Sequence, residues 1–375
     1  MNLQLTSEQQ MLRESAVRWV AERGRAALHG DDAAPKDARW REMADMGWLA
    51  MTLPERDGGL GQGIAEACVL AEALGAGPVA EPYLAAVLQG AALLAAGGSE
   101  AQRARWLPAI AAGDAIVVPA TIERGAAHDL GRMATRAVRE GEGWRIDGAK
   151  SIVPSGQSAA AWIVGARVED GSVAFFLVER DAVGVAARGF ETVDGAGACA
   201  LVLEGVRVDD STRLPKASLA EYERVNDFAL IAACAESVGA MDALVKATVD
   251  YTRQRTQFGR PLAANQVLRH RMADMSILAE EARSITLGAI LAFAGGDQGA
   301  GRRAAAAARA KVGLGARRVA EEAIQLHGGM GVTQELSIGV HLRRQMALDA
   351  MFGPAEFHLR RHAQMRKPLD TGSEN

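Results

Sequence analysis

The chain has 375 residues, which is too long for one simple hydrophobic core and predicts two or three domains. Its formal net charge of −4 indicates neither a nucleic acid nor an acidic membrane surface as a partner. Cys68, Cys199 and Cys234 lie far apart, without metal-binding or redox spacing, so we expect reduced thiols in a cytoplasmic protein. We see no secretory apolar segment and no uninterrupted apolar run long enough to cross a bilayer, so we expect no membrane association.

Residues 1–114 have the periodicity of an α-helical domain. A glycine-rich stretch at 57–63 loosely resembles a dinucleotide-binding fingerprint. No strand of a parallel sheet precedes it, and no acidic residue follows at the required spacing. We therefore interpret this stretch as a loop before an alanine-rich helix over 64–75.

Residues 115–215 change to the short alternating pattern of β-strands. The stretches 134–139 and 144–148 alternate on either side of Glu140–Gly143, which predicts a hairpin. Further strands are expected over 161–166, 173–178 and 200–208. Strands at this spacing predict a small antiparallel barrel or sandwich.

Residues 216–375 return to long helices, and the first of them ends in an unusual corner. An apolar stripe with helical spacing runs from Ile231 to Thr252 and stops at residues 253–261, where Gly259 and Pro261 break the helix. Cations lie just before the break, where a helix end favours them. Packing alone does not require a corner with cations, an aromatic residue and two helix breakers. This corner is therefore the strongest indication of a functional site in the sequence.

At this point the chain resembles the flavin-dependent acyl-CoA dehydrogenases. The C-terminal signatures of that family match Arg255–Leu262 together with Gln266, and Gln325–Gly329. A middle-domain strand motif matches Ile146–Lys150 after the predicted hairpin. The order of helices, sheet and helices covers the whole chain. Within the family, the chain is most similar to the small subunits of bacterial pimeloyl-CoA-type dehydrogenases.

The resemblance implies a mainly α fold with a middle antiparallel β domain and a C-terminal four-helix bundle. It also implies FAD, an acyl-CoA substrate, electron-transfer flavoprotein as acceptor, and a homo- or hetero-tetramer. The FAD would lie at a subunit interface. The residues that match its binding positions are Arg255, Phe258, Gln266, Gln325, Gly328 and Gly329. Without the resemblance, Phe258 would be read as a core aromatic and Gly328 as an ordinary helix cap.

The chain departs from the family where the catalytic base belongs. The reaction needs a carboxylate near the thioester to remove the α-proton. One usual position is occupied here by Phe352 and the other by Ala229, and neither can accept a proton. Asp227, two residues away on the same helix, is the first substitute, although such a residue is more often solvated or capping.

The positions that would hold the chain's own flavin are also altered. His128 replaces a serine of the family's flavin loop, and Pro154 replaces the residue that donates to the flavin ring. Proline has no backbone N–H to donate instead. The positions that serve a neighbour's FAD are retained, while those that serve the chain's own flavin and base are degraded.

Three interpretations follow. The chain is an ordinary dehydrogenase with a displaced base, or a weakly active partner subunit that completes another chain's FAD site, or a flavoprotein of the same fold with different chemistry, such as oxygenation. No metal site is expected, because His358 and His362 lie four residues apart without an evident third ligand.

Overall fold

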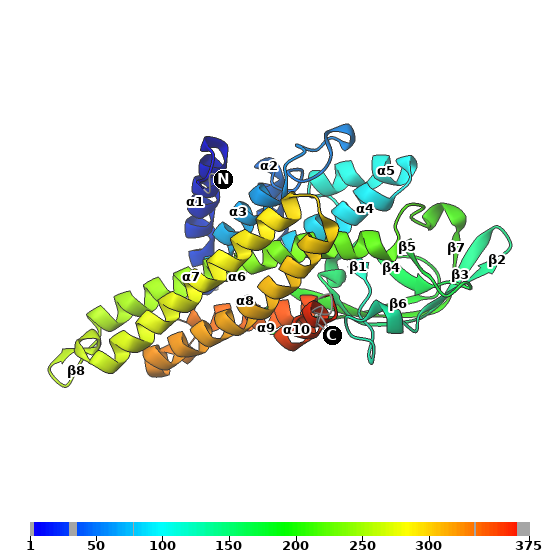
Figure 1. The fold of residues 1–375 in the computed structure, drawn as a ribbon. Coiled ribbons are helices and arrows are strands. Elements are labelled where there is room, and N and C mark those ends of the chain that lie inside the picture. The colour runs from blue at the N-terminus through cyan, green and yellow to red at the C-terminus, as the bar shows by residue number, and fades with distance from the viewer. Residues whose placement is uncertain (1–3, 30–35, 78, 334, 366–375) are drawn as a thin grey trace, which may run out of the picture.

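The computed structural model describes residues 4–29, 36–77, 79–333 and 335–365, and it places a helical part, a β part and a second helical part in that order (Figure 1). This confirms the predicted fold class. The first part contains α1 (Ser7–His29), α2 (Lys36–Asp45), α3 (Ile64–Gly75), a π-helix (Tyr83–Ala91), α4 (Ala92–Gly97) and α5 (Glu100–Ala111). The helix expected over 64–75 is α3, and turns occupy the glycine-rich stretch before it.

The middle part is one seven-stranded sheet with the order β1-β4-β2-β3-β7-β6, in which β5 also pairs with β4. Its strands are β1 (Val117–Ala120), β2 (Arg136–Glu140), β3 (Gly143–Pro154), β4 (Ala161–Arg167), β5 (Val173–Glu179), β6 (Val185–Glu191) and β7 (Gly197–Asp209). The predicted hairpin is the antiparallel β2–β3 pair, with Gly141 at φ 58° in its turn.

The sheet differs from the prediction in two respects. It is mainly antiparallel, but β1 pairs with β4 in parallel, from Val117 opposite Ala161 to Ala120 opposite Val164. The strand β6 was not predicted. The side chains of residues 186–191 are all exposed, so this edge strand has no alternation of buried and exposed positions to reveal it.

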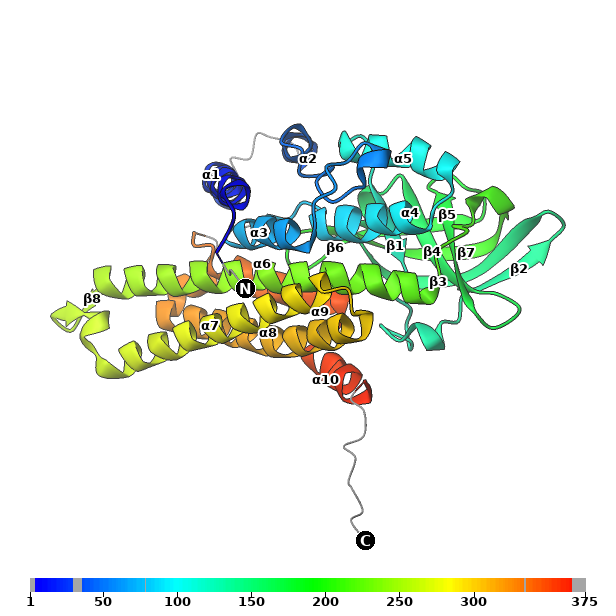
Figure 2. The same cartoon turned by 45° about the horizontal axis from the view of Figure 1, so that its top comes forward.

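The last part is a bundle organised around α6 (Leu219–Gln254), which Figure 2 shows lying between the N-terminal helices and α7 and α8. The other helices are α7 (Gln266–Ala294), α8 (Gln298–His327), α9 (Ile338–Phe352) and α10 (Ala355–Gln364). Among the described residues this C-terminal part therefore contains the helices α6 to α10.

Two glycines allow α3 and α6 to pack backbone against backbone. A Cβ added at Gly75 would lie 1.9 Å from the carbonyl oxygen of Glu236, and one added at Gly239 would lie 1.9 Å from that of Glu72. No side chain fits at either position. These two glycines therefore set the close approach of α3 and α6.

By length and composition, α6 could cross a membrane, contrary to the expectation that no segment was apolar enough. In this structure, however, 78% of its most apolar window is buried inside the protein. The helix is the centre of the bundle, and its apolar character is explained by that packing.

Candidate functional site

The corner after α6 is a two-residue β-hairpin at the far end of the bundle. The strands β8 (Thr256–Gln257) and β9 (Arg260–Pro261) pair antiparallel. Phe258 and Gly259 between them have φ values of 53° and 73°, and positive φ at both central residues is the signature of a type I′ turn. A left-handed conformation costs an ordinary residue roughly 1–2 kcal/mol. The hairpin therefore holds an aromatic residue in a strained conformation.

Phe258 is fully exposed, at 100% of its possible surface. The interpretation of this residue as a core aromatic is therefore wrong. Arg255 and Gln266, at the two ends of the corner, are exposed as well. An aromatic side chain presented in this way is suited to contact something outside the chain.

The second motif lies at the same end of the bundle. Tyr251, near the end of α6, stacks on His327, the last residue of α8, with ring centroids 4.4 Å apart. Nearby, the guanidinium Nε of Arg271 donates to Glu322 over 2.6 Å and links α7 to α8. These contacts join the end of α6 and the start of α7 to the end of α8. The structure therefore brings the hairpin residues and Gln325–Gly329 to one end of the molecule (Figure 1).

The α8 end of this region leaves backbone open to a ligand. Gln325, Gly328 and Gly329 are exposed, and a Cβ built on either glycine would meet nothing within 4 Å. Gly328 caps α8 with φ 59° and ψ −137°. Exposed glycines let a ligand approach the chain closely, and the Arg255 guanidinium suits a phosphate group. This end of the bundle therefore fits the phosphate-bearing part of FAD.

The junction that would hold the chain's own flavin ring is closed. Ile152 and Pro154 on β3 and Met351 on α9 line a cavity of only about 40 Å³. Ligand pockets usually have about 300–1,000 Å³. Ala229 and Phe352, the two positions of the missing base, are both buried. A flavin ring does not fit this junction.

Arg344 of α9 holds this junction together. Its Nε donates to Glu236 of α6 over 2.6 Å, and its Nη1 donates to Asp194 in the β6–β7 loop over 2.9 Å. Burial acts to lower the pKa of the Arg344 guanidinium, but its two carboxylate partners outweigh burial and raise that pKa above its usual range. Through these two ion pairs, Arg344 connects the β6–β7 loop of the sheet to α6 and α9 of the bundle.

Asp227, the candidate base, is completely buried and already paired. Both of its oxygens accept hydrogen bonds from Arg361 of α10, at 2.5 and 2.8 Å, and Arg302 lies 3.8 Å away. Burial raises the pKa of Asp227, while the arginines act to lower it. Its role as a base stays a prediction, but these contacts favour a structural role in attaching α10 to α6.

A second buried charge lies near Phe352, and the sequence analysis missed it. Arg309 of α8 is fully buried and donates through Nη2 to Asp349 over 2.6 Å, while its Nε and Nη1 have no partner among the residues that the structure describes. Burial, assisted by the charge of Arg309, lowers the pKa of His128 to about 4. His358 Nε2 bonds the carbonyl oxygen of Phe352 over 2.8 Å. The groups described near Phe352 are therefore cationic or neutral, apart from the Asp349 carboxylate, which is paired with Arg309.

The two histidines considered for a metal each bond a backbone carbonyl, that of Phe352 for His358 and that of Arg303 for His362. Within the part of the chain that the structure describes, no three His, Cys, Asp or Glu residues are grouped as metal ligands would be.

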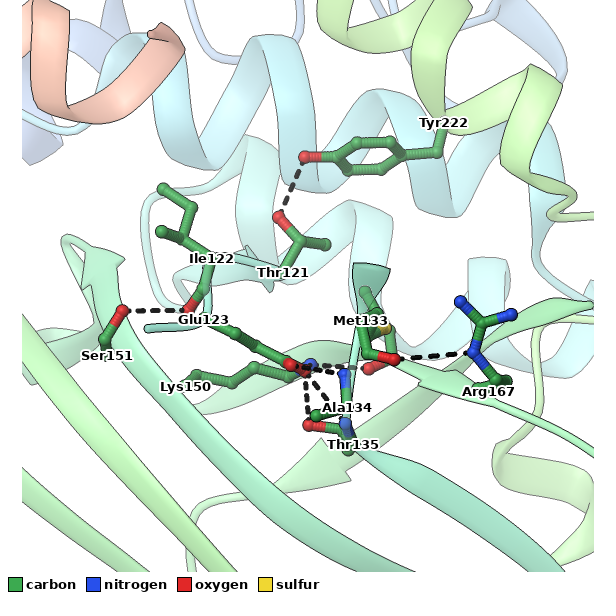
Figure 3. Close-up of polar contacts among 11 residues, drawn as sticks. Thr121, Ile122, Glu123, Met133, Ala134, Thr135, Lys150, Ser151, Arg167 and Tyr222 are labelled. Atoms are coloured by element: carbon green, nitrogen blue, oxygen red, sulfur yellow. Dashed lines mark hydrogen bonds and ion pairs between the residues drawn. The ribbon is translucent and has the colours of Figure 1, made fainter. Parts of the chain in front are cut away.

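Lys150, the last residue of the matched strand motif, forms a buried ion pair with Glu123 (Figure 3). Its Nζ donates to Glu123 Oε1 and to the Gly165 carbonyl, both over 2.7 Å. Glu123 also accepts from the Thr135 hydroxyl over 2.6 Å. Burial lowers the pKa of Lys150 to about 8, although Glu123 acts to raise it. Lys150 therefore ties β3 to β4 through Gly165 and to the segment after β1 through Glu123.

Comparisons with known proteins agree along the whole chain. The acyl-CoA dehydrogenase N-terminal, middle and C-terminal domains match residues 6–114, 120–206 and 227–365. A probable acyl-CoA dehydrogenase of Bacillus subtilis, YngJ, is 29% identical, with 95% of this chain and 97% of that protein covered. Two solved structures come from two-component proteins. The ChsE4-ChsE5 complex of Mycobacterium tuberculosis has a TM-score of 0.87 at 26% identity, covering 97% of this chain and 98% of the other. A variant of the Tcur3481-Tcur3483 steroid ACAD has a TM-score of 0.84 at 30% identity, covering 96% and 97%.

Proposed function

Because this chain belongs to the acyl-CoA dehydrogenase family, we propose that it is the subunit of a mixed acyl-CoA dehydrogenase that completes the FAD site of a second, catalytic subunit. The assembly would oxidise an acyl-CoA thioester to the 2-enoyl-CoA. One contrast carries the proposal. Arg255, Phe258 and the Gln325–Gly329 end of α8, which would serve a neighbour's FAD, present exposed residues at one end of the bundle. The junction for the chain's own flavin, in contrast, encloses a cavity of only about 40 Å³.

The chain's own residues would bind and orient the cofactor. The Arg255 guanidinium, at the end of α6, would bond the pyrophosphate in a planar fork. The backbone at Gly328 and Gly329 would approach the same group, and Phe258 would exclude water from it. FAD, when bound, supplies the hydride acceptor, whereas the proton acceptor would belong to the second subunit, because Phe352 and Ala229 cannot fill that role.

Two further observations support a mixed assembly. The similar ChsE4-ChsE5 and Tcur3481-Tcur3483 structures each contain two differently named components. In addition, Phe258 is wholly exposed in the single chain, and an apolar side chain at an ordered tip is typical of an interface residue. We propose electron-transfer flavoprotein as the electron acceptor of the complex.

The test compares the purified chain alone with the chain co-purified with the product of its genomic neighbour. Flavin per chain is measured by absorbance, and acyl-CoA oxidation by dye reduction. We expect little flavin and little activity in the lone chain, and both in the complex. One FAD per chain with full activity in the lone protein would overturn the proposal.

A matched pair of arginine variants sharpens this test. Arg255→Ala should lower the flavin content and activity of the complex without unfolding the chain, because the residue is exposed. Arg188→Ala removes an equally exposed cation from β6, far from the hairpin, and should change neither quantity. Equal effects of the two variants would mean that only net charge matters.

The competing interpretation is a self-sufficient dehydrogenase with a displaced base. All three domains of the family are present, which favours it. In that case Asp227→Asn should abolish turnover and spare FAD binding. A partner subunit should instead show unchanged turnover per folded complex.

A further inference from the structure

A large cavity lies apart from both regions described above. It has a volume of about 1050 Å³ and lies between α1 and α3 on one side and α6, α7 and the start of α9 on the other. In Figure 1, α1 runs steeply across the direction of α6 and α7. No residue of the hairpin, of the α8 end or of the closed flavin junction lines this cavity. Its volume is slightly above the range for small-molecule sites, about 300–1,000 Å³.

Part of the wall is apolar and made of small residues, which helps to explain the space. Ala243 and Ala247 of α6 and Ala73 of α3 leave room, and Leu287 and Ile290 of α7 face them. Protein interiors are normally packed to crystal density with few voids larger than a water molecule. A cavity of this size, with apolar residues on α3, α6 and α7 along part of its wall, is therefore a candidate site for a molecule with an apolar body.

One polar side chain in the wall, that of His341, has no hydrogen-bond partner among the described residues and reaches the cavity. His341 of α9 is only 4% exposed, and no hydrogen bond to its ring is formed among the described residues. Ser337, one turn earlier, also lines the cavity, and its hydroxyl does not cap the helix that it begins. Both side chains can therefore form a hydrogen bond with a ligand that enters the cavity.

The charges around the cavity indicate that the ligand is uncharged. Arg283 bonds Glu72 over 2.8 Å and also pairs with Asp242. Three cations and three carboxylates line the cavity in all: Arg13, Lys246, Arg283, Glu72, Asp242 and Asp250. Because these charges balance, the cavity as a whole attracts neither an anion nor a cation. Burial lowers the pKa of His341 to about 4, so its ring is neutral and has one donor and one acceptor.

We propose that this cavity binds an uncharged, elongated apolar molecule whose single hydroxyl or carbonyl oxygen bonds His341. A hydroxyl group complements the neutral imidazole best, because both can donate and accept. The apolar body lies against α3, α6 and α7. The site is independent of the proposed FAD role, since no residue is shared.

The test uses the full chain and three ten-carbon probes: 1-decanol, decane and decanoate. Binding is measured by titration calorimetry. We expect saturable binding of decanol, with decane and decanoate at least tenfold weaker. His341→Leu should reduce the difference between decanol and decane to less than threefold. No saturable binding of decanol, or equal or tighter binding of either other probe, would overturn the proposal.

Variants that fill the cavity locate the probe. Ala243→Phe should abolish decanol binding, and Ala247→Leu provides a milder filling if the first variant does not fold by circular dichroism. Ala187→Phe adds the same ring at an exposed position of β6 and should leave binding unchanged. Decanol binding that survives a folded filling variant would refute this location.

Discussion

Replacing Glu123 by glutamine tests whether the buried Lys150 pair fixes the middle sheet. The variant keeps the shape and one oxygen of the side chain but removes the charge that Lys150 Nζ meets at 2.7 Å. At an effective dielectric constant of about 20, two charges at that distance attract by roughly 6 kcal/mol. The hydrogen bond from Lys150 to Gly165 is kept. Removing one partner of a buried pair typically costs about 3–5 kcal/mol, and we expect a loss in that range.

The measurement is urea unfolding followed by tryptophan fluorescence, with Trp162 buried in the same sheet as a reporter. The exposed pair Arg105–Glu179 provides the control, because Glu179→Gln should cost no more than about 1 kcal/mol. The double variant Glu123→Gln with Lys150→Met removes both charges and should recover most of the loss. A Glu123→Gln loss no larger than that of the control would refute this account of the pair.

The pH dependence gives an independent test. The pKa of Lys150 is about 8 in the folded chain, because burial lowers it, and removing the carboxylate should lower it further. The unfolded chain binds this proton up to about pH 10.4. Between the two pKa values the unfolded state holds more protons, so the free energy of unfolding rises with pH. In the variant this rise begins at a lower pH than in the unchanged chain, so the deficit of Glu123→Gln should shrink as the pH approaches about 8 and stay level above that value. A deficit that is constant from about pH 6 to pH 10 would contradict the argument.

Three further outcomes are expected. Asp227→Asn leaves Arg361 buried without a full counter-charge and should lower the free energy of unfolding by about 3–5 kcal/mol, measured in urea. Gly75→Ala forces a Cβ against the Glu236 carbonyl and should lower the urea midpoint, with a cost of about 1–3 kcal/mol or more. Phe258→Ala should change the stability of the lone chain by less than about 0.5 kcal/mol, because the ring is fully exposed. The same variant should weaken flavin retention by the complex, measured by gel filtration and absorbance.

Each of these outcomes has a result that would contradict it. A stable Asp227→Asn protein without turnover would restore Asp227 as the base. An unchanged midpoint for Gly75→Ala would mean that α3 and α6 separate without cost. Normal flavin retention in the Phe258→Ala complex would remove the ring from the FAD site.

The order of the three parts and the position of the hairpin could be predicted because both depend on local patterns. Residues close together in the sequence predict both the β2–β3 hairpin and the helix break at Gly259. The edge strand β6 could not be predicted, because its exposed side chains show no periodicity. Hydrophobic periodicity therefore predicts those helices and strands that bury one face and leave the other exposed.

Long-range contacts decided the rest. Arg344 closes the flavin junction through Asp194, which is 150 residues away, and no short-range pattern indicates that pair. Arg309 lies in an alanine-rich stretch, and only the packing of α8 against α9 shows that it pairs with Asp349. The cavity beside His341 depends on how α1 lies across the bundle. The residue type alone shows that Pro154 has no N–H to donate to a flavin ring. It does not show that the cavity beside Pro154 is small.

The type I′ turn at the end of α6 also bears on how subunits associate. Phe258 and Gly259 already have the backbone conformation of the turn in the single chain, and the flanking strands pair around them. An ordered tip loses little conformational entropy when a partner covers it, so more of the contact energy remains as affinity. Docking can then proceed as a nearly rigid encounter, without the slow step of folding a loop. The strain stored at Phe258 is thus offset within the subunit before any partner arrives.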